Sequence, residues 1–283
     1  MNQSAWRGHG KDGYIDKIEE RLSLAGIDNP RREAIALMQL ATSRQATTDA
    51  ASIDGLIKAL LEEREAHRSL SRIAGVKQFY GLSVRLDDNV YEPCISTERL
   101  LEHALEWQTD RAEALRILDL GTGSGNLLLA ALRTLPDATG IGVDCNPAAI
   151  ALARENAASS QLSSRCLLLD GDAHNLGLSG FDIVFSTLPW IPTSQLDDLM
   201  PEVRLYDPVE ALDGGRDGLD HFRSLAKGLG GMLNAGGSGF LQIGYERVKD
   251  AQELFARAGY RDSELLRDIY GFPMGLRVGK KTT

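Results

Sequence analysis

The N-terminal part of the chain shows the hydrophobic pattern of helices. Apolar residues recur every three or four positions there, for example at Ile15 and Ile18, and this spacing is typical of one buried helix face. The pair Asn29-Pro30 indicates a helix start, because Asn caps helices well and Pro suits their first position. Residues 1–75 are therefore predicted to form a small helical domain.

The rest of the chain alternates strand and helix patterns. Residues 76–98 place aromatic and β-branched residues around Gly81 and predict a β-hairpin that links this domain to residues 99–283. Strands are predicted at Arg116–Leu120, Gly140–Asp144, Arg165–Asp170, Phe181–Ser186, Gly239–Gly244, Ser263–Arg267 and Gly275–Val278. Helices are predicted at Asn126–Thr134, Pro147–Ala157, Gly218–Leu229 and Val248–Ala258. This alternation predicts an α/β fold with a mostly parallel sheet covered by helices on both faces.

Composition narrows the class of protein. Hydrophobic residues make up 43% and charged residues 25% of the 283 residues, as in ordinary globular proteins. No apolar run approaches the roughly 18 residues of a membrane span, and the N-terminus lacks the apolar segment of a secretory signal. Three widely spaced cysteines argue against disulfides or a metal site and favour a cytoplasmic location. The net charge of −9 argues against a nucleic-acid partner.

A glycine-rich turn is the most informative segment. The strand pattern Arg116–Leu120 runs into Gly121-x-Gly123-x-Gly125, and a helix pattern follows. Glycines permit a tight turn and let a ligand approach the backbone. The next strand ends at Asp144, at a distance along the chain close to that at which a carboxylate meets a ribose hydroxyl.

Two other interpretations of this turn are a plain strand–helix connection and a dinucleotide site. The glycine spacing differs from the G-x-G-x-x-G of dinucleotide sites, and Asp119 directly precedes the loop. A carboxylate there would repel a pyrophosphate but could receive an ammonium group. The combination resembles the first two motifs of class I S-adenosylmethionine-dependent methyltransferases, whose Rossmann-like fold has seven strands.

The third strand ends in a motif that fits the same resemblance. In that class, the acid at Asp172 typically receives the adenine amino group, and the next backbone amide reaches a ring nitrogen. The resemblance implies S-adenosyl-L-methionine as cofactor. The residues that it assigns to cofactor binding are Asp119, Gly121, Thr122, Gly123, Gly125, Asn126, Asp144, Cys145, Asp172, Ala173 and Thr187.

The fourth strand runs into Thr187-Leu188-Pro189-Trp190. This tetrapeptide resembles the (N/D/S)-P-P-(Y/F/W) motif of methyltransferases that act on planar nitrogens, and the resemblance gives these four residues the catalytic role. Strand ends at the switch point of such a sheet are also where the fold holds substrates.

Further segments resemble HemK/PrmC-type glutamine N5-methyltransferases over nearly the whole chain. They include the stretch from Glu202 to Leu219, which is specific to that branch, and the segment Pro93–Glu98. The departures concentrate at the substrate end: Thr-Leu-Pro-Trp replaces Asn-Pro-Pro-Tyr, and the Pro93–Glu98 segment lacks the family's Arg. Intact cofactor motifs with an altered acceptor motif indicate a changed acceptor.

Three functions remain open. Thr187 cannot copy the carboxamide that holds an amide acceptor, and Trp190 offers a larger π face to a cation. With Glu92 and Glu98 as substrate-binding carboxylates, these residues favour a small-molecule acceptor, preferably the guanidino group of L-arginine or a related amino compound. The alternatives are the glutamine of the GGQ motif in peptide-chain release factors, and a non-catalytic module that binds S-adenosylmethionine. Glu246 is a further candidate for the acid.

Overall fold

The computed structural model describes residues 11–47, 52–108, 114–172 and 176–280. Contacts divide the chain into two units. One comprises Met1–Val76 together with Met200–Tyr206, and the other comprises Lys77–Leu199 together with Asp207–Thr283. The sequence pattern predicts residues 200–206 as part of the C-terminal domain, whereas their contacts place them in the first unit.

The first unit is helical and has its own apolar core. Its helices are α1 (Lys11–Leu24), α2 (Pro30–Thr47), α3 (Ile53–Glu65), α4 (Leu70–Ala74) and the short α8 (Pro201–Arg204). Helix α2 starts at Pro30 as predicted. The Ser52 side chain caps α3 by accepting a hydrogen bond from the Gly55 amide at 3.2 Å. Fully buried Ile18, Leu37 and Leu61 come from three different helices and pack in one cluster.

An ion cluster ties the Met200–Tyr206 segment into this unit. The Arg64 side chain is only 7% exposed; its Nε donates to Glu33 at 2.7 Å, and both of its terminal nitrogens donate to Glu202 Oε1 at 3.2 Å. The Tyr206 hydroxyl donates to the Ala66 carbonyl at 2.6 Å. Glu202 and Tyr206 are more than 130 positions from their partners Arg64 and Ala66 in the chain, so no local sequence pattern predicts these two pairings.

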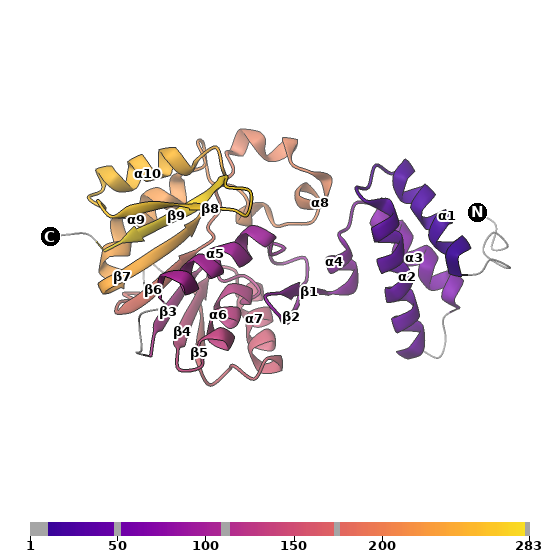
Figure 1. The fold of residues 1–283 in the computed structure, drawn as a ribbon, viewed down its shortest axis with the longest axis horizontal. Coiled ribbons are helices and arrows are strands. Elements are labelled where there is room, and N and C mark those ends of the chain that lie inside the picture. Colours follow the sequence, from indigo (N-terminus) through magenta and orange to yellow (C-terminus); the bar gives the residue numbers. More distant parts are fainter. Residues whose placement is uncertain (1–10, 48–51, 109–113, 173–175, 281–283) are drawn as a thin grey trace. The chain divides into compact units, whose positions relative to one another are not determined.

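The second unit contains a seven-stranded sheet in the order β5-β4-β3-β6-β7-β9-β8 (Figure 1). Its strands are β3 (Arg116–Leu120), β4 (Thr139–Asp144), β5 (Cys166–Asp170), β6 (Phe181–Ser186), β7 (Leu233–Gln242), β8 (Ser263–Arg267) and β9 (Pro273–Gly279). Neighbouring strands are parallel from β5 through β7, and β9 pairs antiparallel with both β7 and β8. The mostly parallel α/β fold is therefore confirmed.

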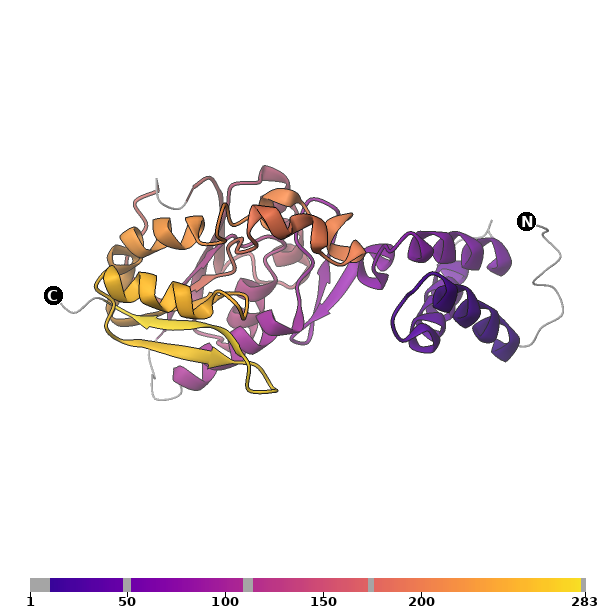
Figure 2. The same ribbon diagram turned by 90° about the horizontal axis from the view of Figure 1, so that it is seen from above.

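Helices cover both faces of this sheet. They are α5 (Ile95–Trp107), α6 (Asn126–Thr134), α7 (Pro147–Ser159), α9 (Asp220–Met232) and α10 (Val248–Arg257), and Figure 2 shows the sheet from above. Alternate residues of a strand face opposite sides: Ile117 packs in a core with α5, α6 and α7, whereas Leu118 packs in a second core with α9 and α10. The predicted hairpin is β1 (Val76–Phe79) and β2 (Leu82–Arg85).

Strand β7 begins earlier than the prediction, which starts at Gly239. The segment from Leu233 onward looks like a loop because Gly236 and Gly237 lie in it. The structure nevertheless pairs Leu233 with Phe181, and the register shifts before Ser238 pairs with Ile183. Such a shift in register is the irregularity that glycines allow in a strand.

The order of the strands fixes where a ligand can bind. Chain connections leave β3 toward β4 on one side, and β6 lies on its other side. Open α/β sheets bind ligands at the carboxyl ends of the strands beside such a switch point. The glycine-rich turn follows β3, and the Thr187–Trp190 motif follows β6.

Candidate active site

Asp119 lies buried in β3, immediately before the glycine turn. One of its oxygens, Oδ2, accepts a hydrogen bond from the Thr122 hydroxyl at 2.8 Å. The other, Oδ1, is buried and has no hydrogen-bond partner within the described residues. Burial raises the pKa of this carboxyl to about 7, although the Thr122 bond opposes the rise. A buried acceptor without a donor is costly, so Asp119 is poised for a cationic ligand group.

The glycine turn brings backbone amides to Asp144. Gly121, Gly123 and Gly125 all have positive φ angles, of 71°, 54° and 78°, which L-residues with side chains rarely adopt. The Gly123 amide donates to Asp144 Oδ2 at 2.9 Å, and the Asn146 amide donates to its Oδ1 at the same distance. The Asp144 carboxylate is therefore held at the carboxyl end of β4, next to the turn.

Residues after β5 complete this end of the sheet. The Gly171 amide donates to the Asp144 backbone carbonyl at 2.9 Å, so the strand ends of β4 and β5 stay together. Cys145 is exposed, and partial burial raises the pKa of its thiol, with the charges of Asp144 and Asp172 adding to the rise. Asp172 is exposed. Ala173 lies outside the described residues.

Strand β6 delivers the tetrapeptide motif to the same place. Leu120 pairs with Ser186 across β3 and β6, and a Cβ on Gly121 would lie 3.4 Å from the Leu188 side chain. Thr187 and Leu188 therefore follow directly beside the glycine turn. Within the described part of the chain, the structure shows no hydrogen bond to the Thr187 hydroxyl or to the Leu188 carbonyl. Both oxygens can accept from a substrate N–H.

The sequence patterns missed Ser186. Its hydroxyl is fully buried and, like Asp119 Oδ1, has no partner among the described residues. The two unpartnered groups lie at the carboxyl ends of neighbouring strands. The strand register pairs Asp119 with Phe185 and Leu120 with Ser186, so the Asp119 carboxylate and the Ser186 hydroxyl belong to opposite faces of the sheet.

Trp190 lies at the far end of the motif, against the end of β7. A Cβ on Gly244 would lie 2.1 Å from Trp190 Cζ3, so the indole packs directly on this glycine. Trp190 also lines a cavity of about 530 Å³, together with Asp198, Tyr245, Glu246 and Arg247. The carboxylates beside Trp190 are thus Asp198 and Glu246.

Glu92 and Glu98, the predicted substrate carboxylates, do not line that cavity. Glu92 forms an ion pair with Lys77 at 2.8 Å, and its amide donates to Asp207. Glu98 accepts a hydrogen bond from the Tyr80 amide in the hairpin turn at 3.0 Å. In this structure both carboxylates hold the hairpin segment, and Glu246, the further candidate, lines the cavity with Trp190 and Asp198.

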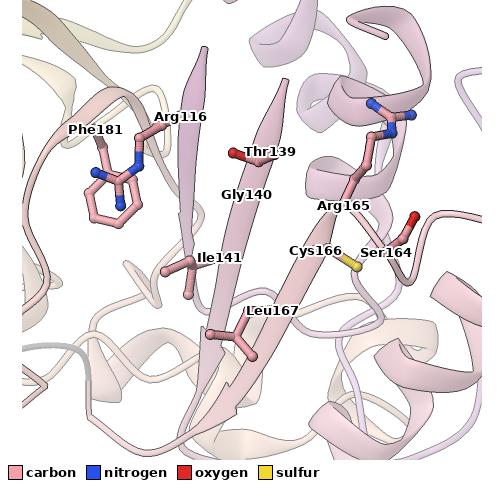
Figure 3. A pocket seen from close by; sticks show the side chains of 9 residues that line it. All are labelled: Arg116, Thr139, Gly140, Ile141, Ser164, Arg165, Cys166, Leu167 and Phe181. Atoms are coloured by element: carbon pink, nitrogen blue, oxygen red, sulfur yellow. The ribbon is translucent and has the colours of Figure 1, made fainter. Parts of the chain in front are cut away.

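A second cavity, of about 290 Å³, opens at the opposite ends of the strands (Figure 3). Its lining includes the first residues of β3, β4 and β6: Arg116, Thr139 and Phe181. The Arg116 guanidinium stands 5.1 Å from the centre of the Phe181 ring. This cavity lies at the amino ends of the strands, away from every motif described above.

Among the described residues no group of His, Cys, Asp and Glu could hold a metal ion, and no helix could span a membrane.

The residues at the carboxyl ends of the strands fit an S-adenosylmethionine molecule. The unpartnered Asp119 oxygen suits the ammonium of its methionine part, Asp144 suits ribose hydroxyls, and the open glycine turn lets the molecule approach the backbone. This fold and this set of groups define a class I S-adenosylmethionine-dependent methyltransferase.

Comparisons with known proteins agree. A family model described as "Methyltransferase domain" matches residues 111–233. The release factor glutamine methyltransferase of Caulobacter vibrioides is 37% identical over 260 residues, which are 89% of this chain and 90% of that protein. The enzyme of the same name from Rhodospirillum rubrum is 34% identical over 268 residues, 91% of this chain and 81% of that protein. The chain belongs to the release factor glutamine methyltransferase family.

The fold alone extends to more distant structures. The hMettl16 catalytic domain, solved in complex with MAT2A 3'UTR hairpin 6, superposes with a TM-score of 0.58 at 14% sequence identity. The match covers 78% of this chain and 81% of that chain.

Proposed function

We propose that this enzyme methylates the side-chain amide of a glutamine in a peptide-chain release factor. The observation that carries the proposal is the family membership: relatives named for this activity match at 34–37% identity over about nine-tenths of the chain. The sequence patterns favour a free guanidino compound instead, and the relatives do not support that reading. An amide nitrogen is also planar, so the motif after β6 suits it.

The reaction needs a cofactor and a well-placed nitrogen. When bound, S-adenosylmethionine supplies a methyl group whose bond to a positively charged sulfur breaks, with the electron pair staying on sulfur, as the new bond to nitrogen forms. The amide nitrogen loses one proton to solvent in the exchange. The enzyme's main task is to place the nitrogen behind the methyl carbon, and such positioning can contribute about 7–11 kcal/mol.

The Thr187–Trp190 motif can do this positioning. The Leu188 carbonyl and the Thr187 hydroxyl accept the two N–H bonds of the glutamine amide, which directs the nitrogen toward the glycine turn beside Leu188. Asp119 and Asp144, which adjoin the same turn, would hold the cofactor there.

One observation favours a second candidate, a free guanidino or amino compound. The cavity beside Trp190 carries the carboxylates of Asp198 and Glu246 next to the indole and the Tyr245 ring, and such a combination attracts a cation. The two candidates therefore differ in what occupies this cavity.

A methylation assay with labelled cofactor distinguishes the two. We expect the enzyme to transfer label to intact release factor, with mass spectrometry locating one methyl group on a glutamine, and to leave free L-arginine unlabelled. Labelled arginine with unlabelled release factor would overturn the proposal. Absence of label on both, with S-adenosylhomocysteine still bound, would show a non-catalytic binding protein.

Thr187→Asn tests the role of the motif. The carboxamide adds a stronger and better directed acceptor than the hydroxyl, so kcat on release factor is expected to rise, by about ten-fold for one improved hydrogen bond of about 1.4 kcal/mol. Thr193→Asn is the control, because Thr193 is exposed and bonds to Asp213 outside the motif. A lower kcat for Thr187→Asn would show that Thr187 is adapted to another acceptor.

A further inference from the structure

An exposed aromatic turn lies next to the cavity that Trp190 lines. The turn joins β8 to β9 and presents Ile269, Tyr270 and Phe272 to solvent, with 68%, 79% and 57% of their surfaces exposed. The Phe272 ring packs edge-on against Tyr245, with 5.8 Å between ring centres. Because Tyr245 also lines the cavity, the turn and the cavity form one continuous surface, which we call the aromatic ledge.

The turn is held rigidly although its apolar side chains point outward. The Asp268 carboxylate accepts hydrogen bonds from the Tyr270 and Phe272 amides, each at 2.9 Å. The Asp268 amide donates to the Phe272 carbonyl at 2.9 Å, and Arg267 donates to the Gly271 carbonyl at 2.7 Å. A preorganised apolar surface binds a partner at little cost in conformational entropy, and exposed aromatic clusters mark interaction sites.

The charges beside the ledge indicate what it binds. Asp198 and Glu246 line the cavity, and neither makes an ion pair within the described residues. Of the cations near the ledge, Arg247 faces Asp250 at 3.6 Å, and the charge of Arg267 in the turn is offset by that of Asp268, so the negative charge prevails. A complementary segment carries a basic side chain for the cavity and an apolar side chain for the turn.

We propose that the aromatic ledge docks a segment of the acceptor protein, next to the residue to be methylated, through one basic and one apolar side chain. A free amino acid has a single side chain and cannot fill the cavity and cover the turn together. The ledge therefore contributes affinity for a polypeptide acceptor without touching the transferred methyl group. This inference rests on the proposed function, since its occupant is the protein acceptor.

The double variant Ile269→Ser/Tyr270→Ser tests the ledge. Both side chains are exposed and the turn is held by backbone groups and Asp268, so the variant keeps the fold. We expect the KM for intact release factor to rise about ten-fold, as for the loss of an interface hot spot, with kcat and the Kd for S-adenosylhomocysteine unchanged. Leu167→Ser is the matched control. Leu167 is also exposed, but it lines the second cavity, at the amino ends of the strands.

A short synthetic peptide with a Gly-Gly-Gln core and no flanking residues completes the test. Wild type and double variant are expected to methylate this peptide with equal kcat/KM, because it is too short to reach the turn between β8 and β9. An unchanged KM for intact release factor, while wild type methylates it, overturns the ledge proposal alone. No methylation of release factor by wild type overturns the proposed function and the ledge with it.

Self-association is the remaining outcome. Light scattering on wild type and double variant shows whether the ledge joins two copies of the chain. A wild-type dimer that becomes monomeric in the variant, with an unchanged KM for release factor, would assign the ledge to a second copy and overturn the docking of an acceptor.

Discussion

Replacing Asp119 with Asn is expected to weaken S-adenosylhomocysteine binding about 100-fold, the equivalent of about 2.7 kcal/mol for a lost charge-assisted hydrogen bond. The side chain keeps its shape, and its amide oxygen still accepts the Thr122 hydroxyl. What disappears is the negative charge of the carboxylate whose Oδ1 is buried without a donor in the described residues. Isothermal titration calorimetry on the full-length protein measures the effect.

The stability of the same variant is expected to move the other way. The pKa of Asp119 rises from 3.8 to about 7 in the folded chain, chiefly through burial. The unfolded chain thus loses this proton first, and ionisation of Asp119 costs stability as the pH rises from about 4 to 7. Asp119→Asn removes that cost, so the melting temperature at pH 8 should equal or exceed that of wild type.

Cofactor affinity should depend on pH through the same group. A bound ammonium favours the ionised carboxylate and lowers its pKa, so binding below pH 7 releases a proton. The Kd for S-adenosylhomocysteine is expected to fall as the pH rises toward 7 and to level off above it, and Asp119→Asn should lose this dependence. Asp137→Asn, at an exposed position, is the control. An unchanged Kd in a folded Asp119→Asn protein would contradict the assignment.

Local patterns were sufficient to predict the elements that carry the part of the candidate site continuous in sequence. Strand Arg116–Leu120 has the predicted bounds. A strand buried on both faces is a continuous run of mostly apolar residues, and such a run is easy to recognise in the sequence. The glycine turn directly follows β3, and Asp144 ends β4. Parallel pairing of β3 with β4 brings these two strand ends together. The positions of these residues could therefore be predicted from the sequence, and their roles in cofactor binding stay predictions.

The acceptor end was harder because distant segments build it. Glu92 looks available in the sequence, but it forms an ion pair with Lys77 of β1. Asp198 and Glu246 come from segments almost fifty positions apart and meet only where Trp190 packs at the end of β7. Long-range pairing also takes Glu202 out of the unit that surrounds it in sequence and joins it to Arg64. No periodicity in the chain encodes such pairings.

Replacing Gly244 with Ala is expected to lower kcat for release factor methylation about 100-fold, since small displacements of catalytic groups cost that much. A Cβ there would lie 2.1, 2.4 and 2.6 Å from three atoms of the Trp190 ring, which must move. The cofactor groups at β3 and β4 are untouched, so the Kd for S-adenosylhomocysteine should stay near the wild-type value. Gly231→Ala is the control, because a Cβ there meets nothing within 4 Å.

Adding Trp190→Phe separates displacement of the indole from a general defect. The clashing atoms Cε3, Cζ3 and Cη2 belong to the six-membered ring of the Trp190 indole. Phe has one ring in place of the two fused rings and is therefore smaller there. Gly244→Ala should therefore cost much less kcat in the Trp190→Phe background than in wild type, and the double-mutant cycle would show strong coupling between the two positions. Full activity of Gly244→Ala, or equal losses in both backgrounds, would mean that contact between Gly244 and the indole does not position the acceptor motif.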